Sequence, residues 1–257
     1  MSSPLLSARR VTKRFGGRTA CHDVSFDLWP GEVLGIVGES GSGKTTLLNC
    51  LAGRLVPDGG SVAYETRSAG IVDVHHLSEA RRRLLARTEW GFVNQDAREG
   101  LRMGVSAGAN IGERLMAVGA RHYGEIRGQA IDWMARVELD AERIDDRPTT
   151  YSGGMRQRLQ IARNLVSNPR LVFMDEPTGG LDVSVQARIL DLLRGLVEGL
   201  HLSAVLVTHD LGVARLLTHR LMVMQGGAVV EQGLTDQVLD DPQHPYTQML
   251  VASILPV

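Results

Sequence analysis

The chain has 257 residues, 43% hydrophobic and 22% charged, a composition typical of a globular protein with a sizeable core. Its 28 basic and 29 acidic residues give a formal net charge of −1, so no strong overall field favours nucleic acid or an anionic membrane. No apolar run approaches the ~20 residues of a membrane span, and the N-terminus lacks a signal-peptide pattern. The two cysteines, Cys21 and Cys50, have no ligand-like spacing, and we expect a cytoplasmic, reducing location.

The N-terminal part predicts short strands separated by turns that contain glycine, proline and aspartate, which indicates a small antiparallel layer. These strands are expected at residues 5–11, 22–28 and 61–64. Four apolar runs, in contrast, are hydrophobic on both faces, as buried parallel strands are. They cover residues 33–37, 171–174, 204–207 and 221–224.

Helical patterns lie between these strands, the clearest being an apolar stripe at 3.6 spacing from Val185 to Leu200. The alternation predicts an α/β core with a mainly parallel sheet. Residues of about 96–167 carry helical patterns without a convincing strand and are expected to form a helical insertion. We predict one domain over 1–257: the antiparallel layer and part of the core over 1–95, the helical subdomain, and the rest of the core with C-terminal helices over 168–257.

Between the strand 33–37 and a predicted helix at 45–52 lies the pattern Gly38-x4-Gly43-Lys44-Thr45. Its glycines let backbone N–H groups converge on phosphate oxygens at a helix N-terminus, and Thr45 offers a hydroxyl to Mg²⁺. Of the 28 basic residues only Lys13 and Lys44 are lysines, so lysine is retained at a place where a planar guanidinium would be too wide.

Two carboxylates, Asp175 and Glu176, end the apolar run Leu171–Met174. The carboxyl edge of an open α/β sheet is where ligands bind. Asp175 is expected to orient Mg²⁺ through its water shell, and Glu176 to polarise an attacking water.

A third motif, Tyr151-Ser152-Gly153-Gly154-Met155, precedes a predicted helix over 158–166. Ser152 can cap this helix, and the glycines expose its first amides to an anion. Alone the motif indicates an ordinary capped helix.

The three motifs in this order resemble the ATP-binding cassette (ABC) ATPases over essentially the whole chain. The resemblance implies the P-loop ABC ATPase fold, ATP and Mg²⁺ as ligands, and Lys44, Glu176 and His209 as catalytic residues. It also implies that Thr45, Gln95 and Asp175 bind the metal. The implied nucleotide-binding residues are Phe15, Gly38, Ser40, Gly41, Ser42, Gly43, Lys44, Thr45, Thr46, Gln95, Ser152, Gly153, Gly154, Met155 and Asp182.

Family members work as head-to-tail pairs, so the resemblance implies a second ABC chain as partner, either an identical copy or a paralogue. ATP at Lys44 of one chain would be covered by Ser152 and Gly154 of the other. Neither nucleic acid binding nor direct insertion into a membrane is expected.

Within the family, two interpretations compete. Met155, the run Asp182–Ala187 and the ending His244-Pro245-Tyr246-Thr247 resemble ATPase subunits of dipeptide, oligopeptide and nickel importers. Longer stretches, and the pair Gly179-Gly180, more closely resemble the ABC-type K subunits of carbon–phosphorus lyase systems.

The lyase resemblance implies association with a soluble lyase core that includes a radical S-adenosylmethionine subunit and acts on phosphonates. Residues 96–125, with Arg114, His122 and Tyr123, are the predicted docking surface for the partner. The His244-Pro245-Tyr246 turn is predicted to lead into a helix, and Gly179-Gly180 to loosen its loop.

Overall fold

The computed structural model describes residues 3–253 and divides into two compact units. The first unit comprises residues 1–82 and 196–257, and the second residues 83–195. The boundaries pass through α2 (Glu79–Thr88) and α7 (Val183–Leu200). Among residues 3–253, no helix combines the length and apolar character required to cross a bilayer.

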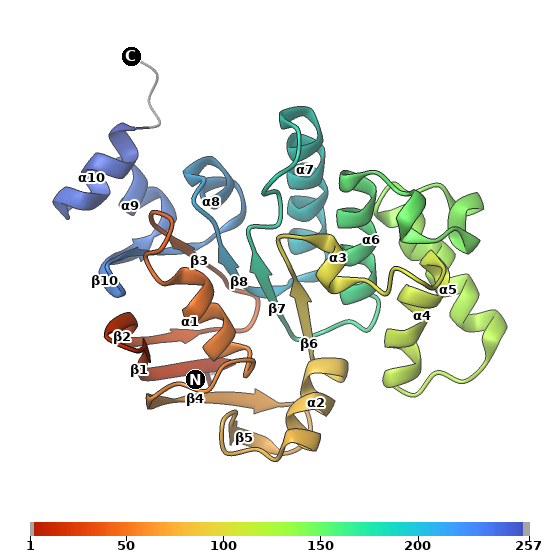
Figure 1. Ribbon diagram of the computed structural model, residues 1–257, viewed down its shortest axis with the longest axis horizontal. Helices are drawn as coiled ribbons and strands as arrows, with labels where there is room; N and C mark the ends of the chain where they lie inside the picture. The colour runs from red at the N-terminus through yellow and green to blue at the C-terminus, as the bar shows by residue number, and fades with distance from the viewer. Residues whose placement is uncertain (1–2, 254–257) are drawn as a thin grey trace. The chain divides into compact units, whose positions relative to one another are not determined.

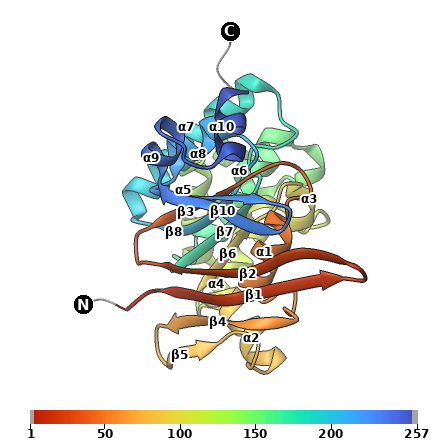
Figure 2. The same ribbon diagram turned by 90° about the vertical axis from the view of Figure 1, so that its left-hand side faces the viewer.

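The first unit contains an antiparallel sheet in the order β2-β1-β4-β5, which Figure 2 shows with its strands side by side. These strands are β1 (Leu6–Phe15), β2 (Arg18–Leu28), β4 (Gly59–Thr66) and β5 (Gly70–Asp73). The predicted antiparallel layer is therefore present, with β5 as a strand that the sequence patterns missed.

A second group of strands in this unit lies in the order β10-β9-β3-β8. Its members are β3 (Val33–Val37), β8 (Ser203–Val207), β9 (Arg220–Gln225) and β10 (Ala228–Leu234). β3 pairs in parallel with β8 and β9, while β10 is antiparallel to β9. Every residue of β3 and β8 is buried, as the apolar runs predicted for parallel strands.

Four helices complete the first unit, and Figure 1 shows the last three in blue. They are α1 (Lys44–Leu51), α8 (Leu211–Leu217), α9 (Thr235–Asp240) and α10 (Pro245–Ala252). α1 packs against β1 and β2. Cys21 of β2 and Cys50 of α1 are both fully buried free thiols.

The second unit is mainly helical, as expected for the insertion, and its elements run from yellow to green in Figure 1. Two parallel strands, β6 (Trp90–Val93) and β7 (Leu171–Asp175), pair here. The unit also contains α3 (Ala97–Gly100), α4 (Ala107–Ala117), α5 (Tyr123–Arg136), the 3₁₀ turns Ala141–Asp145 and Pro148–Thr150, and α6 (Gly153–Leu165). The end of α2 and most of α7 belong to it as well.

Candidate functional site

The phosphate loop connects β3 to α1, as the sequence predicts. Gly38, Gly41 and Gly43 have φ of 145°, 80° and 103°, values that L side chains rarely adopt. A Cβ at Gly43 would lie 1.8 Å from the carbonyl oxygen of Ala20, and one at Gly38 would lie 2.1 Å from that of Met224. The neighbouring backbone thus leaves no space for side chains at these two positions.

Lys44 is buried, and its ammonium donates to the carbonyl oxygens of Gly38 at 2.7 Å and Glu39 at 2.8 Å. The Oγ of Ser42 is also buried and has no hydrogen-bond partner in the described part of the chain. A compact cation, an unsatisfied hydroxyl and glycine-rich backbone at a helix N-terminus together fit a bound phosphate group.

Three further predicted contacts lie in the same unit. Phe15 ends β1 with 53% of its surface exposed, and the Lys13 ammonium lies 5.6 Å from its ring centroid. Thr45 is exposed in the first turn of α1. His209 is exposed just after β8, the strand that pairs in parallel with β3, so it emerges at the same sheet edge as the loop.

Asp175 and Glu176 stand at the end of β7 in the second unit. β6 and β7 are parallel, so Gln95, two residues after β6, emerges at the same edge. Gln95 donates a hydrogen bond from Nε2 to Oε2 of Glu176 at 3.0 Å. Glu176 has a φ of 42°, and a non-glycine residue in this region is typical of strained functional positions.

The glycine pair that separates the two interpretations lies beside this hydrogen bond. A Cβ at Gly179 would lie 3.0 Å from Nε2 of Gln95, and Gly180 adopts a φ of 71°. The amide of Gly179 also donates to the carbonyl of Glu176 at 2.9 Å. Gly179 therefore gives Gln95 space next to Glu176; whether the pair loosens the loop stays a prediction.

The third motif forms a capped helix start. Ser152 precedes α6, and its Oγ accepts the N–H of Met155 at 3.3 Å. Ser152 and Gly153 are exposed, while a Cβ at Gly154 would lie 2.4 Å from Cγ1 of Val185. Asp182 is exposed just before α7. The start of α6 thus exposes Ser152 and Gly153, while Gly154 is buried and the Met155 N–H is used by the cap.

Arg143 is a residue that the sequence patterns missed, and it contacts two residues of this motif, Tyr151 and Met155. Its guanidinium lies 4.6 Å from the ring centroid of Tyr151 and donates to the sulfur of Met155 at 3.6 Å. The Tyr151 hydroxyl donates to the Arg143 carbonyl, and Asp146 accepts from Nε at 2.8 Å. The hydrogen bond to Asp146 holds the pKa of Arg143 above its usual value.

Buried glutamines of α6 form a second missed contact. Gln157 donates to the carbonyls of Asn94 at 3.3 Å and Pro177 at 2.7 Å. Gln160 accepts the N–H of Asn94 at 2.8 Å and donates to its carbonyl. The helix of the third motif is thereby fastened to the residue before Gln95 and the residue after Glu176.

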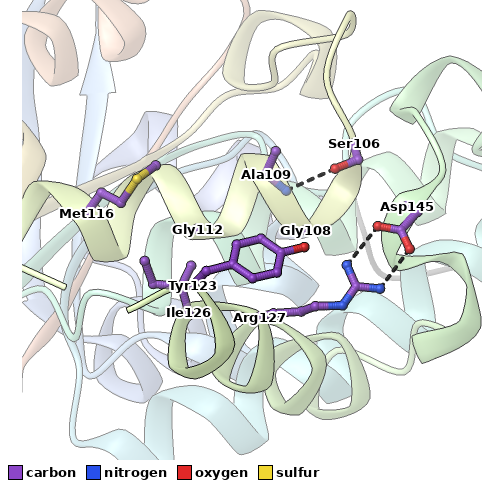
Figure 3. Close-up of a pocket in the computed structure, with 9 residues that line it drawn as sticks. All are labelled: Ser106, Gly108, Ala109, Gly112, Met116, Tyr123, Ile126, Arg127 and Asp145. Atoms are coloured by element: carbon purple, nitrogen blue, oxygen red, sulfur yellow. Dashed lines mark hydrogen bonds and ion pairs between the residues drawn. The ribbon is translucent and has the colours of Figure 1, made fainter. Parts of the chain in front are cut away.

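A groove of about 210 Å³ lies between α4 and α5 and falls largely within the predicted docking range 96–125 (Figure 3). Gly108 and Gly112 line it from α4, Tyr123 and Arg127 line it from α5, and Arg127 forms an ion pair with Asp145 at 2.7 Å. Tyr123 is 73% exposed, so this docking residue stays a candidate.

Arg114 is wrong as a docking residue, because its side chain is buried. It donates to the carbonyl oxygens of Ala86, at 2.7 Å, and Trp90. Burial lowers the pKa of Arg114 to about 10. The Arg114 guanidinium therefore satisfies two backbone carbonyls, one in α2 and one in β6, and burial disfavours its charged form.

The predicted site residues thus fall into two sets. Phe15, the loop 38–46 and His209 belong to the first unit, while Gln95, the motif 152–155, the carboxylates 175–176 and Asp182 belong to the second. This combination defines an ATP-binding cassette. The family model described as ABC transporter matches residues 21–179, and the chain belongs to this family. It is an ABC ATPase, which uses ATP with Mg²⁺.

Individual relatives show which ABC ATP-binding proteins this chain is most similar to among those compared. The chain is 66% identical over 255 residues to the putative phosphonates utilization ATP-binding protein PhnK of Escherichia coli, covering 99% of both chains. It is 37% identical to the oligopeptide transport ATP-binding protein AmiE of Streptococcus pneumoniae, covering 97% of this chain and 72% of the relative. The dimeric post-hydrolysis structure of the cassette MJ0796 bound to ADP and Pi matches with a TM-score of 0.79 at 30% identity, covering 90% of this chain and 98% of that one.

Proposed function

We propose that this chain is the ATP-hydrolysing subunit of a carbon–phosphorus lyase assembly and works in the cytoplasm. The observation that carries the proposal is the 66% identity, over 99% of both chains, to a protein named for phosphonate utilization. Relatives named for peptide import reach 39% identity or less among those compared. The importer function is the second candidate, supported by the same relatives and by the His244-Pro245-Tyr246-Thr247 ending.

In the first unit, the loop holds the phosphates. Its backbone amides and the Lys44 ammonium neutralise phosphate charge, and the exposed ring of Phe15 stacks on adenine. The imidazole of His209 contacts the γ-phosphate, because it emerges at the same sheet edge as the loop.

The residues that would hold Mg²⁺ are Thr45 through its hydroxyl, Gln95 through its amide oxygen and Asp175 through water. All three donors are oxygens, the ligands that Mg²⁺ prefers. The Gln95 nitrogen donates to Glu176, so its amide oxygen is the atom that remains for the cation. When bound, the ion neutralises charge on the β- and γ-phosphates.

Glu176 accepts a proton from the attacking water. Its hydrogen bond from Gln95 fixes the carboxylate next to the metal-binding amide, so the two groups can sense the same nucleotide. The buried Gln157 and Gln160 transmit that position to α6, whose N-terminus serves the other chain's nucleotide.

The second nucleotide-binding surface acts in trans. Ser152, Gly153, Gly154 and Met155 of one chain cover the γ-phosphate bound by the other, and Asp182 lies at the interface. The exposed Ser152 and Gly153 at the start of α6 support this assignment. Closure completes two sites and phosphate release reopens them, so hydrolysis drives a mechanical cycle in the attached lyase core.

The α4–α5 groove is the proposed docking site for the lyase core, including its radical S-adenosylmethionine subunit. Its lining combines exposed aromatic surface at Tyr123 with the Arg127–Asp145 ion pair, so a partner can combine apolar and charged contacts there.

Co-purification tests this function. A tagged chain, expressed with the lyase core and separately with a peptide permease, is expected to recover the core and not the permease. Tyr123→Ala should weaken recovery of the core, whereas Val56→Ser, at a 57% exposed position in the first unit, should not. Recovery of the permease alone would establish the importer function instead.

A further inference from the structure

The turn His244-Pro245-Tyr246-Thr247 opens α10, as the sequence predicts. His244 caps the helix, because its Nδ1 accepts the N–H of Tyr246 at 3.2 Å, and Pro245 occupies the first turn. The Tyr246 side chain is buried in an apolar cluster. The cluster also contains Val37, Leu211, Ala214, Leu221, Val223, Val238 and Leu239.

The polar end of this buried ring reaches the phosphate loop. The hydroxyl oxygen of Tyr246 accepts the backbone N–H of Glu39 at 3.0 Å. Glu39 is the second residue of the loop and lies 207 positions earlier in the chain. No sequence pattern connects the two residues, and none of the roles assigned above involves Tyr246.

The Glu39 N–H belongs to the same peptide unit as the carbonyl of Gly38, and that carbonyl accepts a hydrogen bond from the Lys44 ammonium at 2.7 Å. One peptide unit is therefore held at both polar ends, by Tyr246 on one side and by Lys44 on the other. Hydrogen bonds in such a chain strengthen one another.

The start of α10 is itself held by a carboxylate. Glu231 of β10 accepts the N–H of Gln243 at 2.8 Å and that of His244 at 3.0 Å, one on each oxygen. Burial raises the pKa of Glu231, but these N–H groups outweigh it and hold the pKa below its usual range. Glu231 is thus ionised at neutral pH and fixes the two residues that lead into the helix.

We propose that Tyr246 is a positioning residue for ATP binding, which keeps the Gly38–Glu39 peptide oriented so that the loop amides and Lys44 are ready for phosphate. The inference rests on the proposed role of the loop. A loop without this anchor must pay an ordering cost when nucleotide binds, so the effect appears in affinity rather than in the chemical step.

The test is Tyr246→Phe in the full-length protein, because it removes one oxygen and keeps the ring in the cluster. One hydrogen bond of ordinary strength corresponds to about a threefold to tenfold rise in the KM for ATP and in the Kd for ADP. The kcat is expected to stay within about twofold.

Val238→Ala is the matched control, since Val238 lies in the same apolar cluster and makes no polar contact with the loop. It should lower the melting temperature at least as much as Tyr246→Phe and leave the KM unchanged. An equal rise in KM for both variants, or an unchanged KM for Tyr246→Phe, would overturn the proposal.

Glu231→Gln gives a second arm. It weakens the clamp on Gln243 and His244, and we expect a smaller rise in KM that adds nothing to that of Tyr246→Phe. If the rises in KM add fully in the double variant, Glu231 and Tyr246 do not act through the same hydrogen bond to the Glu39 N–H, which would contradict the proposal. Lys44→Ala tests the role of the loop separately from the role of Tyr246. If Lys44→Ala abolishes hydrolysis while Tyr246→Phe changes nothing, the loop binds phosphate but Tyr246 does not position it.

Discussion

Two turns that precede helix N-termini are predicted to bind anions, and they are built differently. The phosphate loop before α1 combines three glycines at positive φ with a buried lysine, and surrounding backbone carbonyls leave two of them no space for a side chain. The turn before α6 has a serine cap and no lysine, and its Ser152 and Gly153 are exposed. The first turn has the shape and charge to hold phosphate by itself, whereas the second is proposed to cover a nucleotide that another chain holds.

Their supports also differ. The backbone carbonyls of the phosphate loop accept hydrogen bonds from Lys44 and Arg18, and its Glu39 N–H donates to Tyr246. The turn before α6 is held by Arg143 outside it and by Gln157 within α6. The second arrangement fastens the turn before α6 to Asn94 and Pro177, the residues next to Gln95 and Glu176.

The largest expected effect is that of Glu176→Gln. Loss of the general base should slow phosphate release by about 10²- to 10⁴-fold, while ATP binding remains because the phosphate loop is intact. Phosphate release and nucleotide titration check this, with Asp191→Asn as an exposed control on α7. Turnover at the wild-type rate would show that Glu176 is not the base.

Lys44 tests the first turn directly. Lys44→Ala is expected to reduce hydrolysis about 100-fold or more, and Lys44→Arg should not restore it, because the guanidinium is too wide for the space between the carbonyls of Gly38 and Glu39. Binding of a fluorescent ATP analogue should fall in both variants. Undiminished hydrolysis in either would contradict the assignment.

Two glycine substitutions, one in each turn, compare how much space the two turns leave for a side chain. Gly43→Ala should cost about 3 kcal/mol or more of unfolding free energy, from the φ of 103° and the clash with Ala20. Gly153→Ala meets only the Leu181 side chain at 3.3 Å and should cost less than about 1 kcal/mol. Thermal unfolding measures both; equal losses would remove the proposed distinction.

Arg143→Ala should reduce hydrolysis by about tenfold or less and leave nucleotide affinity unchanged, because it displaces the turn before α6 and not the phosphate loop. Arg136→Ala is the matched control, since Arg136 also lies over an aromatic ring, that of Trp133 at 5.1 Å, away from both turns. A weaker nucleotide affinity in Arg143→Ala would show that the substitution disturbs the phosphate loop, which would contradict this prediction.

The smallest effect is expected for Gly179→Ala. The added methyl group would press on Gln95, so hydrolysis should fall only a few-fold, with the melting temperature nearly unchanged. Gly195→Ala, on α7 with open space around it, serves as the control. Steady-state phosphate release compares the two variants, and an unchanged rate would show that Gln95 needs no space there.

Sequence patterns located both turns, the four buried strands and the N-terminal antiparallel layer, because each depends on local geometry or on a continuous apolar run. They missed β5 and β10, whose residues are mostly half-buried or exposed, and the short strand β6. Such strands gain their stability from a neighbour across the sheet rather than from their own composition.

The sequence by itself therefore determined the ligand, because the spacing of glycines, a lysine and two carboxylates predicts nucleotide binding without knowledge of the tertiary structure. Only the tertiary structure decided what holds these groups in place: Tyr246 on Glu39, Arg143 on Tyr151, and Gln95 on Glu176. It also decided that Arg114 is a buried structural charge rather than a docking residue. Each of these contacts joins residues far apart in the chain or depends on burial, and no local pattern encodes which distant group will meet an unsatisfied N–H.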